Sequence, residues 1–248
     1  MKNLTVLAMV VLIVFSCKEK TKTTFEENAD SAVAEMPKTD TEQEWTILFD
    51  GSSFDAWKEY NTDGVSENWK IENGAMVFYP TEKYEAHNLV TKKEYTDFIL
   101  SLEWKISEGG NSGIFWGVQE NPKLSEAYQT GPEIQVLDNE KHPDAKAGLN
   151  HQAGALYDMV APSKDATKPV GEWNSCIITI DHKEQKGSVN LNGTEVVTFP
   201  VGNEKWDEMV SKSKFADWEH FGKYDTGKIG LQDHGNRVSF RNIKIKEL

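Results

Sequence analysis

The segment 229–235 combines a core-forming strand with side chains that can bind and react. Read with a period of two, Ile229 and Leu231 fall on one face of an expected strand, and Gln232 and His234 fall on the other. The strand therefore offers an apolar face to a core and an amide with an imidazole to a ligand. Because imidazole titrates near neutral pH, it suits general acid–base catalysis.

Two further segments repeat this arrangement. In 133–138, Glu133 and Gln135 alternate with two aliphatic residues, and in 98–106, Glu103 lies opposite a fully apolar face. A merely solvated sheet face tends to carry Thr, Lys, Glu and Ser. The repeated Glu, Gln and His side chains therefore predict a lined groove to which these three segments contribute.

Three of the six histidines, His142, His151 and His234, adjoin residues of the kinds found in functional sites. No compact metal-binding motif is present, so a metal would need ligands from several strands. Glu133, Asp138 and His142 are the candidate ligands, and they would suit a divalent ion, with Ca, Mn and Zn not distinguished. The alternative for Glu133 and Asp138 is capping and ion pairing at a strand end.

Arginine is rare in this chain. Arg237 and Arg241 are the only two, against 25 lysines, and both follow the histidine segment. A guanidinium group can bind a carboxylate at two points, which lysine cannot do. We expect Arg241 to orient Glu133 or Asp138, or else to contact the ligand directly.

The N-terminus has the pattern of a bacterial lipoprotein. Residues 1–16 read as a signal peptide, with an apolar run from Leu4 to Phe15 that is too short for a comfortable membrane span, and Ser16 precedes Cys17. Cys17 is the predicted lipidation site, and residues 17–43 form a polar tether. The alternative is an ordinary cleaved signal. We expect an exported lipoprotein of the periplasm or outer membrane of a Gram-negative bacterium, in contact with the membrane through its lipid alone.

Composition narrows the partners. The formal net charge of −13 argues against nucleic acid, which needs a basic surface. If Cys17 is lipidated, Cys176 is the one remaining cysteine, and it reads as a small buried apolar residue near the start of a strand.

Residues 44–248 predict a single all-β domain. Short apolar runs alternate with turn sequences, and Asn192-Gly193 is typical of a type I′ hairpin. The segment 206–221 has helical spacing in short pieces and is expected to cover one end of the sheets. The best architecture is a jelly-roll β-sandwich with short helical insertions.

Taken together, the motifs resemble those of the bacterial 3-keto-disaccharide hydrolase domain family, whose members have a concanavalin A-like jelly-roll fold. The resemblance runs from about Trp45 to Leu248 and is carried by Leu48-Phe49-Asp50-Gly51, Asn111-Ser112-Gly113-Ile114-Phe115, Glu133-Ile134-Gln135-Val136-Leu137-Asp138-Asn139, Gly154-Ala155-Leu156-Tyr157-Asp158, Gly230-Leu231-Gln232-Asp233-His234-Gly235 and Phe240-Arg241-Asn242-Ile243. Each motif is weak alone, but their order over some 200 residues is specific.

The resemblance implies cleavage of glycosides that carry a ketone at C3. A base would remove the C2 proton, the C1 oxygen would be expelled, and water would add to the enone. The implied catalytic residues are Glu133, His234 and His142, and the implied substrate-binding residues are Glu103, Gln135, Gln232, Arg241, Asn111 and Tyr157. A divalent metal or Arg241 would stabilise the enolate.

The implied partners are an oligosaccharide or glycoside substrate and a sugar 3-dehydrogenase acting upstream. The main alternative is a non-catalytic carbohydrate-binding surface lipoprotein. Exposed aromatic residues with few titratable groups would favour that alternative, whereas the Glu and His content here favours an enzyme.

Overall fold

A computed structural model describes residues 44–83 and 85–248. The predicted signal peptide (1–16), Cys17 and the predicted tether (17–43) lie outside the described residues. Within the described part of the chain, no helix is long and apolar enough to cross a membrane.

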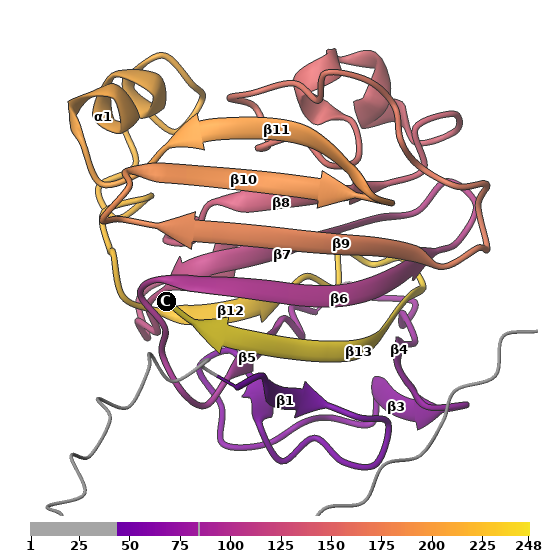
Figure 1. Cartoon of the computed structure of the whole chain (residues 1–248). Helices are drawn as coiled ribbons and strands as arrows, with labels where there is room; N and C mark the ends of the chain where they lie inside the picture. The colour runs from indigo at the N-terminus through magenta and orange to yellow at the C-terminus, as the bar shows by residue number, and fades with distance from the viewer. Residues whose placement is uncertain (1–43, 84) are drawn as a thin grey trace, which may run out of the picture. The chain divides into compact units, whose positions relative to one another are not determined.

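Two antiparallel sheets face each other (Figure 1). The larger sheet has the order β11-β10-β9-β6-β13-β4-β3, with β1 also paired to β13. Its strands are β1 (Thr46–Phe49), β3 (Trp69–Glu72), β4 (Ala75–Phe78), β6 (Phe98–Ile106), β9 (Asn174–Asp181), β10 (Lys186–Leu191), β11 (Thr194–Pro200) and β13 (Val238–Glu247).

The smaller sheet has the order β2-β5-β12-β7-β8. Its strands are β2 (Trp57–Glu59), β5 (Leu89–Thr91), β7 (Asn111–Val118), β8 (Glu133–Leu137) and β12 (Lys228–Leu231). The helical elements are short: η1 (Ala127–Gln129), η2 (Pro143–Lys146), η3 (Leu149–His151) and α1 (Glu204–Ser211). The predicted all-β jelly-roll sandwich with short helical insertions is confirmed.

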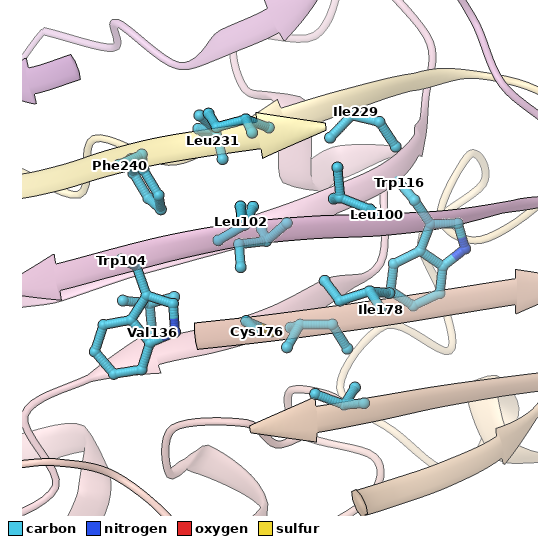
Figure 2. Packing of buried hydrophobic residues seen from close by; sticks show 14 of the residues in the cluster. Leu100, Leu102, Trp104, Trp116, Val136, Cys176, Ile178, Ile229, Leu231 and Phe240 are labelled. Atoms are coloured by element: carbon cyan, nitrogen blue, oxygen red, sulfur yellow. The ribbon is translucent and has the colours of Figure 1, made fainter. Parts of the chain in front are cut away.

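The core lies between the two sheets (Figure 2). Strand β6 contributes every second residue, including Leu100, Leu102 and Trp104, which are almost fully buried. From the smaller sheet, Trp116 and Leu231 point into the same layer. Apolar residues that alternate along a strand face the opposite sheet, and their removal from water stabilises the sandwich.

Local predictions for the hairpin and the cysteine are also confirmed. Strands β10 and β11 pair through a turn in which Asn192 and Gly193 both have positive φ, as a type I′ turn requires. Cys176 is buried in the core, and burial raises the pKa of its thiol to about 12, so the group is unreactive near neutral pH.

Two element boundaries differ from the sequence prediction. Strand β12 ends at Leu231, so Gln232 and His234 lie just beyond it, although the alternation of faces continues. The predicted 206–221 insertion contains one regular helix, α1, and continues as turns to Phe221. We call residues 204–221 the insertion below.

Candidate active site

A cavity of about 560 Å³ lies on the outer face of the smaller sheet, opposite the core. Ile134 of β8 points into the core, and its neighbours Glu133 and Gln135 point into the cavity. The residues that line it are Asn111, Glu126, Tyr128, Gly131, Glu133, Gln135, Tyr157, Lys214, Phe215, Trp218, Phe221, Gln232 and His234. A volume of this size is typical of a small-molecule site.

Glu133 is a buried acidic residue of the cavity, which Glu126 also lines. Burial raises the pKa of its carboxyl group to about 8, the positive charge of Lys214 partly opposes this rise, and the negative charge of Asp144 adds to it. Its carboxyl group fits because Gly113 on β7 has no side chain; a Cβ atom there would overlap Glu133 Oε1. At neutral pH Glu133 is therefore mainly protonated and can donate a proton.

His234 is the basic group of the same cavity. His234 is exposed at the cavity, and the atoms packed around its ring partly desolvate it, which lowers its pKa below the ordinary value of 6.5. The nearby His142 lowers the pKa further. The two rings lie edge to face, with centroids 6.2 Å apart. At neutral pH His234 is therefore mainly neutral and can accept a proton.

His142 lines a second hollow, which shares Asn111, Tyr157 and His234 with the cavity. Its Nδ1 accepts a hydrogen bond from the backbone N–H of Asp144 at 3.2 Å, as the N-cap of η2. Neutral His142 therefore carries its hydrogen on Nε2, which makes the ring a hydrogen-bond donor.

Amide side chains supply further polar contacts. Asn111 Oδ1 and Gln232 Oε1 are buried and have no partner in the described structure, although both residues line the cavity. Asn111 Nδ2 also lies 3.5 Å from His234 Nε2. Buried acceptors without donors are costly unless a ligand satisfies them, and sugar hydroxyl groups are suitable donors.

A carboxylate–imidazole–carboxylate bridge supports one wall of the cavity. His151 Nδ1 lies 2.9 Å from Asp144 Oδ1, and His151 Nε2 lies 3.1 Å from Asp158 Oδ1. The phenol of Tyr157 donates to the other oxygen of Asp144 at 2.9 Å. The backbone N–H of Lys214 donates to the other oxygen of Asp158 at 2.8 Å. The bridge thereby joins the 142–158 segment to the insertion.

The insertion supplies an aromatic wall. Phe215 and Phe221 stack with ring centroids 3.8 Å apart, and Trp218 lies edge-on to both. On the other side lies the ring of Tyr128, with its centroid 5.9 Å from that of Trp218. Sequence reasoning placed the insertion at one end of the sheets but did not assign Lys214 or these rings to the site. The signal available was the helical spacing of the insertion's aromatic residues.

Two predicted site residues lie elsewhere. Glu103 on β6 and Arg241 on β13 are direct neighbours across the larger sheet, on its outward face, and Arg241 Nε donates to Glu103 Oε2 at 2.5 Å. The guanidinium group of Arg241 also stacks on Trp173. The predictions that Glu103 shares a wall with Glu133, and that Arg241 orients Glu133 or Asp138, are therefore wrong. Both residues sit on strands of the other sheet.

The three predicted metal ligands do not converge. Asp138 uses its carboxylate to accept hydrogen bonds from the backbone N–H groups of Gly109, Glu140 and Lys141, so it closes a turn, as the alternative reading held. Within residues 44–83 and 85–248, no group of three or more His, Cys, Asp or Glu side chains could hold a metal ion. Glu133, Asp138 and His142 therefore do not form the predicted metal site, and the mechanism proposed below assigns no step to a metal.

The chain is similar to known proteins over most of its length. Residues 44–246 match the model of the 3-keto-alpha-glucoside-1,2-lyase-like domain. The chain is 37% identical over 231 residues to a 3-keto-disaccharide hydrolase of Bacteroides thetaiotaomicron, a match that covers 82% of this chain and 78% of that protein.

Solved structures show a similar fold. The fold matches a candidate glycosyl hydrolase of Parabacteroides distasonis with a TM-score of 0.74 and 34% identity, over 82% of this chain and 94% of the other. A second candidate glycosyl hydrolase of that species matches with a TM-score of 0.62 and 26% identity, over 83% of this chain and 100% of the other. The match to the domain model spans nearly the whole described region. The chain therefore belongs to the 3-keto-alpha-glucoside-1,2-lyase-like domain family.

Proposed function

We propose that this protein cleaves 3-keto glycosides by elimination followed by hydration. The observation that carries the proposal is that one cavity holds a protonated carboxyl group, Glu133, and a neutral imidazole, His234, near neutral pH. An elimination needs a base and an acid in these protonation states at the same time. The family relative named a 3-keto-disaccharide hydrolase supports a glycoside as substrate.

His234 is the proposed base. A ketone at C3 acidifies the C2 proton, so a neutral imidazole can remove it. The electron pair of the C2–H bond then forms an enolate with the C3 oxygen. Glu133 suits this step less well, because its carboxyl group is mainly protonated at neutral pH. His142, with Nδ1 already accepting a hydrogen bond, is the weaker alternative base.

Glu133 is the proposed acid. The enolate electrons expel the C1 oxygen, which takes the proton of Glu133 and leaves as an alcohol. Water then adds to C1 of the enone and gives its proton to the Glu133 carboxylate, while His234, whose proton exchanges with solvent as the alcohol leaves, protonates C2. The sum is one glycosidic bond and one water consumed, with both side chains restored to their starting states. Asn111, Gln135 and Gln232, which line the cavity, are the proposed ligands of the sugar hydroxyl groups.

Deuterium labelling tests this mechanism. The purified protein is incubated with a 3-keto glucoside in D₂O, and the released 3-keto sugar is analysed by mass spectrometry and NMR. The elimination route predicts deuterium at C2 of the product and a primary isotope effect with C2-deuterated substrate. Release of sugar without label at C2 would rule the route out in favour of direct displacement at C1.

The same assay separates an enzyme from a carbohydrate-binding protein. Retained sugar binding without turnover would support the non-catalytic alternative. An additional series with a chelator tests whether a divalent ion takes part. His234→Ala and Glu133→Gln should each abolish sugar release, and wild-type rates in both variants would disprove the assignment of these two residues.

The proposed reaction also has requirements outside this chain. Because ordinary sugars carry a hydroxyl group at C3, a sugar 3-dehydrogenase must supply the substrate. The sequence pattern around Cys17 favours an exported lipoprotein of the periplasm or outer membrane. Membrane fractionation of wild type and Cys17→Ala tests this location, and an unchanged distribution would argue against a lipid anchor.

A further inference from the structure

We propose that Lys214 stabilises the negative charge that develops on the C3 oxygen during C2 proton removal. This inference rests on the proposed function and adds the group that the acid–base pair lacks. An enolate formed in a partly enclosed cavity needs a preplaced positive charge or hydrogen-bond donor near its oxygen. Before proton transfer neither Glu133 nor His234 is positively charged, and their assigned partners are the C1 oxygen and the C2 proton, so neither is a preplaced charge for the C3 oxygen.

Lys214 is the charged donor that the cavity contains. Among the described residues that line the cavity it is the one lysine, and no arginine lines it. Its charge acts on both reacting groups, because it opposes the raised pKa of Glu133 and contributes to the lowered pKa of His234. A positive charge that both the acid and the base sense is also close enough to affect a sugar bound between them.

The structure holds Lys214 at two points. Its backbone N–H donates to Asp158 Oδ2 at 2.8 Å, and its Nζ lies 4.0 Å from the ring centroid of Tyr157. Asp158 is itself fixed by His151, and Tyr157 is fixed through Asp144. The hydrogen-bonded bridge therefore positions a cation that the insertion carries, which limits the reorganisation needed during the reaction.

The neighbouring lysine of the same segment has a different environment. Lys212 lies two residues earlier, at the C-cap of α1, and its Nζ pairs with Glu208 at 2.6 Å. It does not line the cavity. Lys212 therefore provides a matched control, since its replacement changes the net charge equally and leaves the cavity intact.

The decisive test isolates enolate formation from cleavage. A 3-keto sugar without an exocyclic C1 oxygen, 1-deoxy-3-keto-glucose, can lose its C2 proton but has no glycosidic leaving group to expel. Its C2 exchange in D₂O is followed by NMR with wild type, Lys214→Met, Lys214→Arg and Lys212→Met. Loss of one oxyanion-stabilising donor typically lowers the rate about 10²-fold, so we expect that decrease in Lys214→Met.

The other variants have distinct expected results. Lys214→Arg keeps the positive charge and should retain roughly a tenth or more of the exchange rate, and Lys212→Met should exchange at the wild-type rate. Equal melting temperatures would show that all variants fold. Wild-type exchange in Lys214→Met would overturn the role of Lys214 and leave the proposed function standing. Absence of both exchange and cleavage in wild type would instead overturn the proposed function.

Discussion

Gly113 lies directly beneath the carboxyl group of Glu133, so that a methyl group at position 113 would occupy the space of Oε1. The two residues belong to paired strands, β7 and β8, and the glycine leaves room for the acid. The backbone of Gly113 does not have the positive φ that would by itself exclude other residues. Position 113 therefore requires glycine because a side chain there would occupy the space of the Glu133 carboxyl group.

Gly113→Ala should displace Glu133 and lower kcat for a 3-keto glucoside by roughly 10–100-fold, because a shift of about 1 Å in a reacting group has that effect. Steady-state kinetics measures the change. Gly64→Ala is the control, since Gly64 has no positive φ, has open space around it and does not line the cavity. Unchanged kinetics in Gly113→Ala would show that Glu133 can act from another position.

The pH dependence of kcat/KM should be bell-shaped. The rate falls at high pH as Glu133 loses the proton that it must donate, with a limb near its pKa of about 8. It falls at low pH as His234 gains a proton and stops acting as a base, with a limb below 6.5. Initial rates between pH 4 and pH 10 measure both limbs. A wild-type rate that stays constant from pH 7 to pH 10 would contradict the role of Glu133 as the acid.

Glu133→Gln should stabilise the fold increasingly as the pH rises. The folded-state pKa of about 8 lies above the ordinary value of 4.5, so between these values the folded state holds a proton that the unfolded chain has lost. Stability therefore decreases as pH rises through this window. The gain in unfolding free energy from Glu133→Gln should be about 3 kcal/mol larger at pH 8 than at pH 5. Urea unfolding at both pH values tests this, and a pH-independent gain would contradict the raised pKa.

Arg241→Ala should leave catalysis nearly unchanged. The side chain binds Glu103 on the outward face of the larger sheet, so kcat/KM should stay within about twofold of wild type, as for most sites distant from one another. The loss of stability should be about 1 kcal/mol, since the ion pair is partly exposed. Gln232→Ala provides the contrast, because it removes a buried amide of the cavity and should raise KM. A large kcat loss in Arg241→Ala would restore Arg241 to the site.

The alternation of apolar and polar residues along a strand correctly predicted which side chains face the core. It did not predict which sheet each strand joins. Glu133 and Glu103 both lie opposite apolar faces, and both faces pack on the one core between the sheets. Their strands belong to different sheets, so the two carboxyl groups point away from the sandwich on opposite sides. A period of two is a local property of the chain, whereas sheet membership depends on pairing between strands far apart in sequence.

The remaining part of the site could not be predicted for a related reason. Lys214 reaches the cavity because its backbone is bound by Asp158, 56 residues earlier. The sequence around Lys214 shows only an irregular insertion with scattered aromatic residues. Contacts made by turns depend on the path of the whole chain, and neither periodicity nor composition encodes them. The buried Glu133 was found because its strand is regular.

The cavity is lined by two kinds of structure, the paired strands and the insertion. The acid stands on a strand fixed by its neighbours, and the base directly follows another, whereas the aromatic wall belongs to a surface excursion joining β11 to β12. Such excursions tolerate changes of length and sequence far better than paired strands do. The shape of the cavity can therefore be altered through the aromatic residues at 215, 218 and 221, while Lys214 is kept and the strands that carry Glu133 and precede His234 keep their pairing.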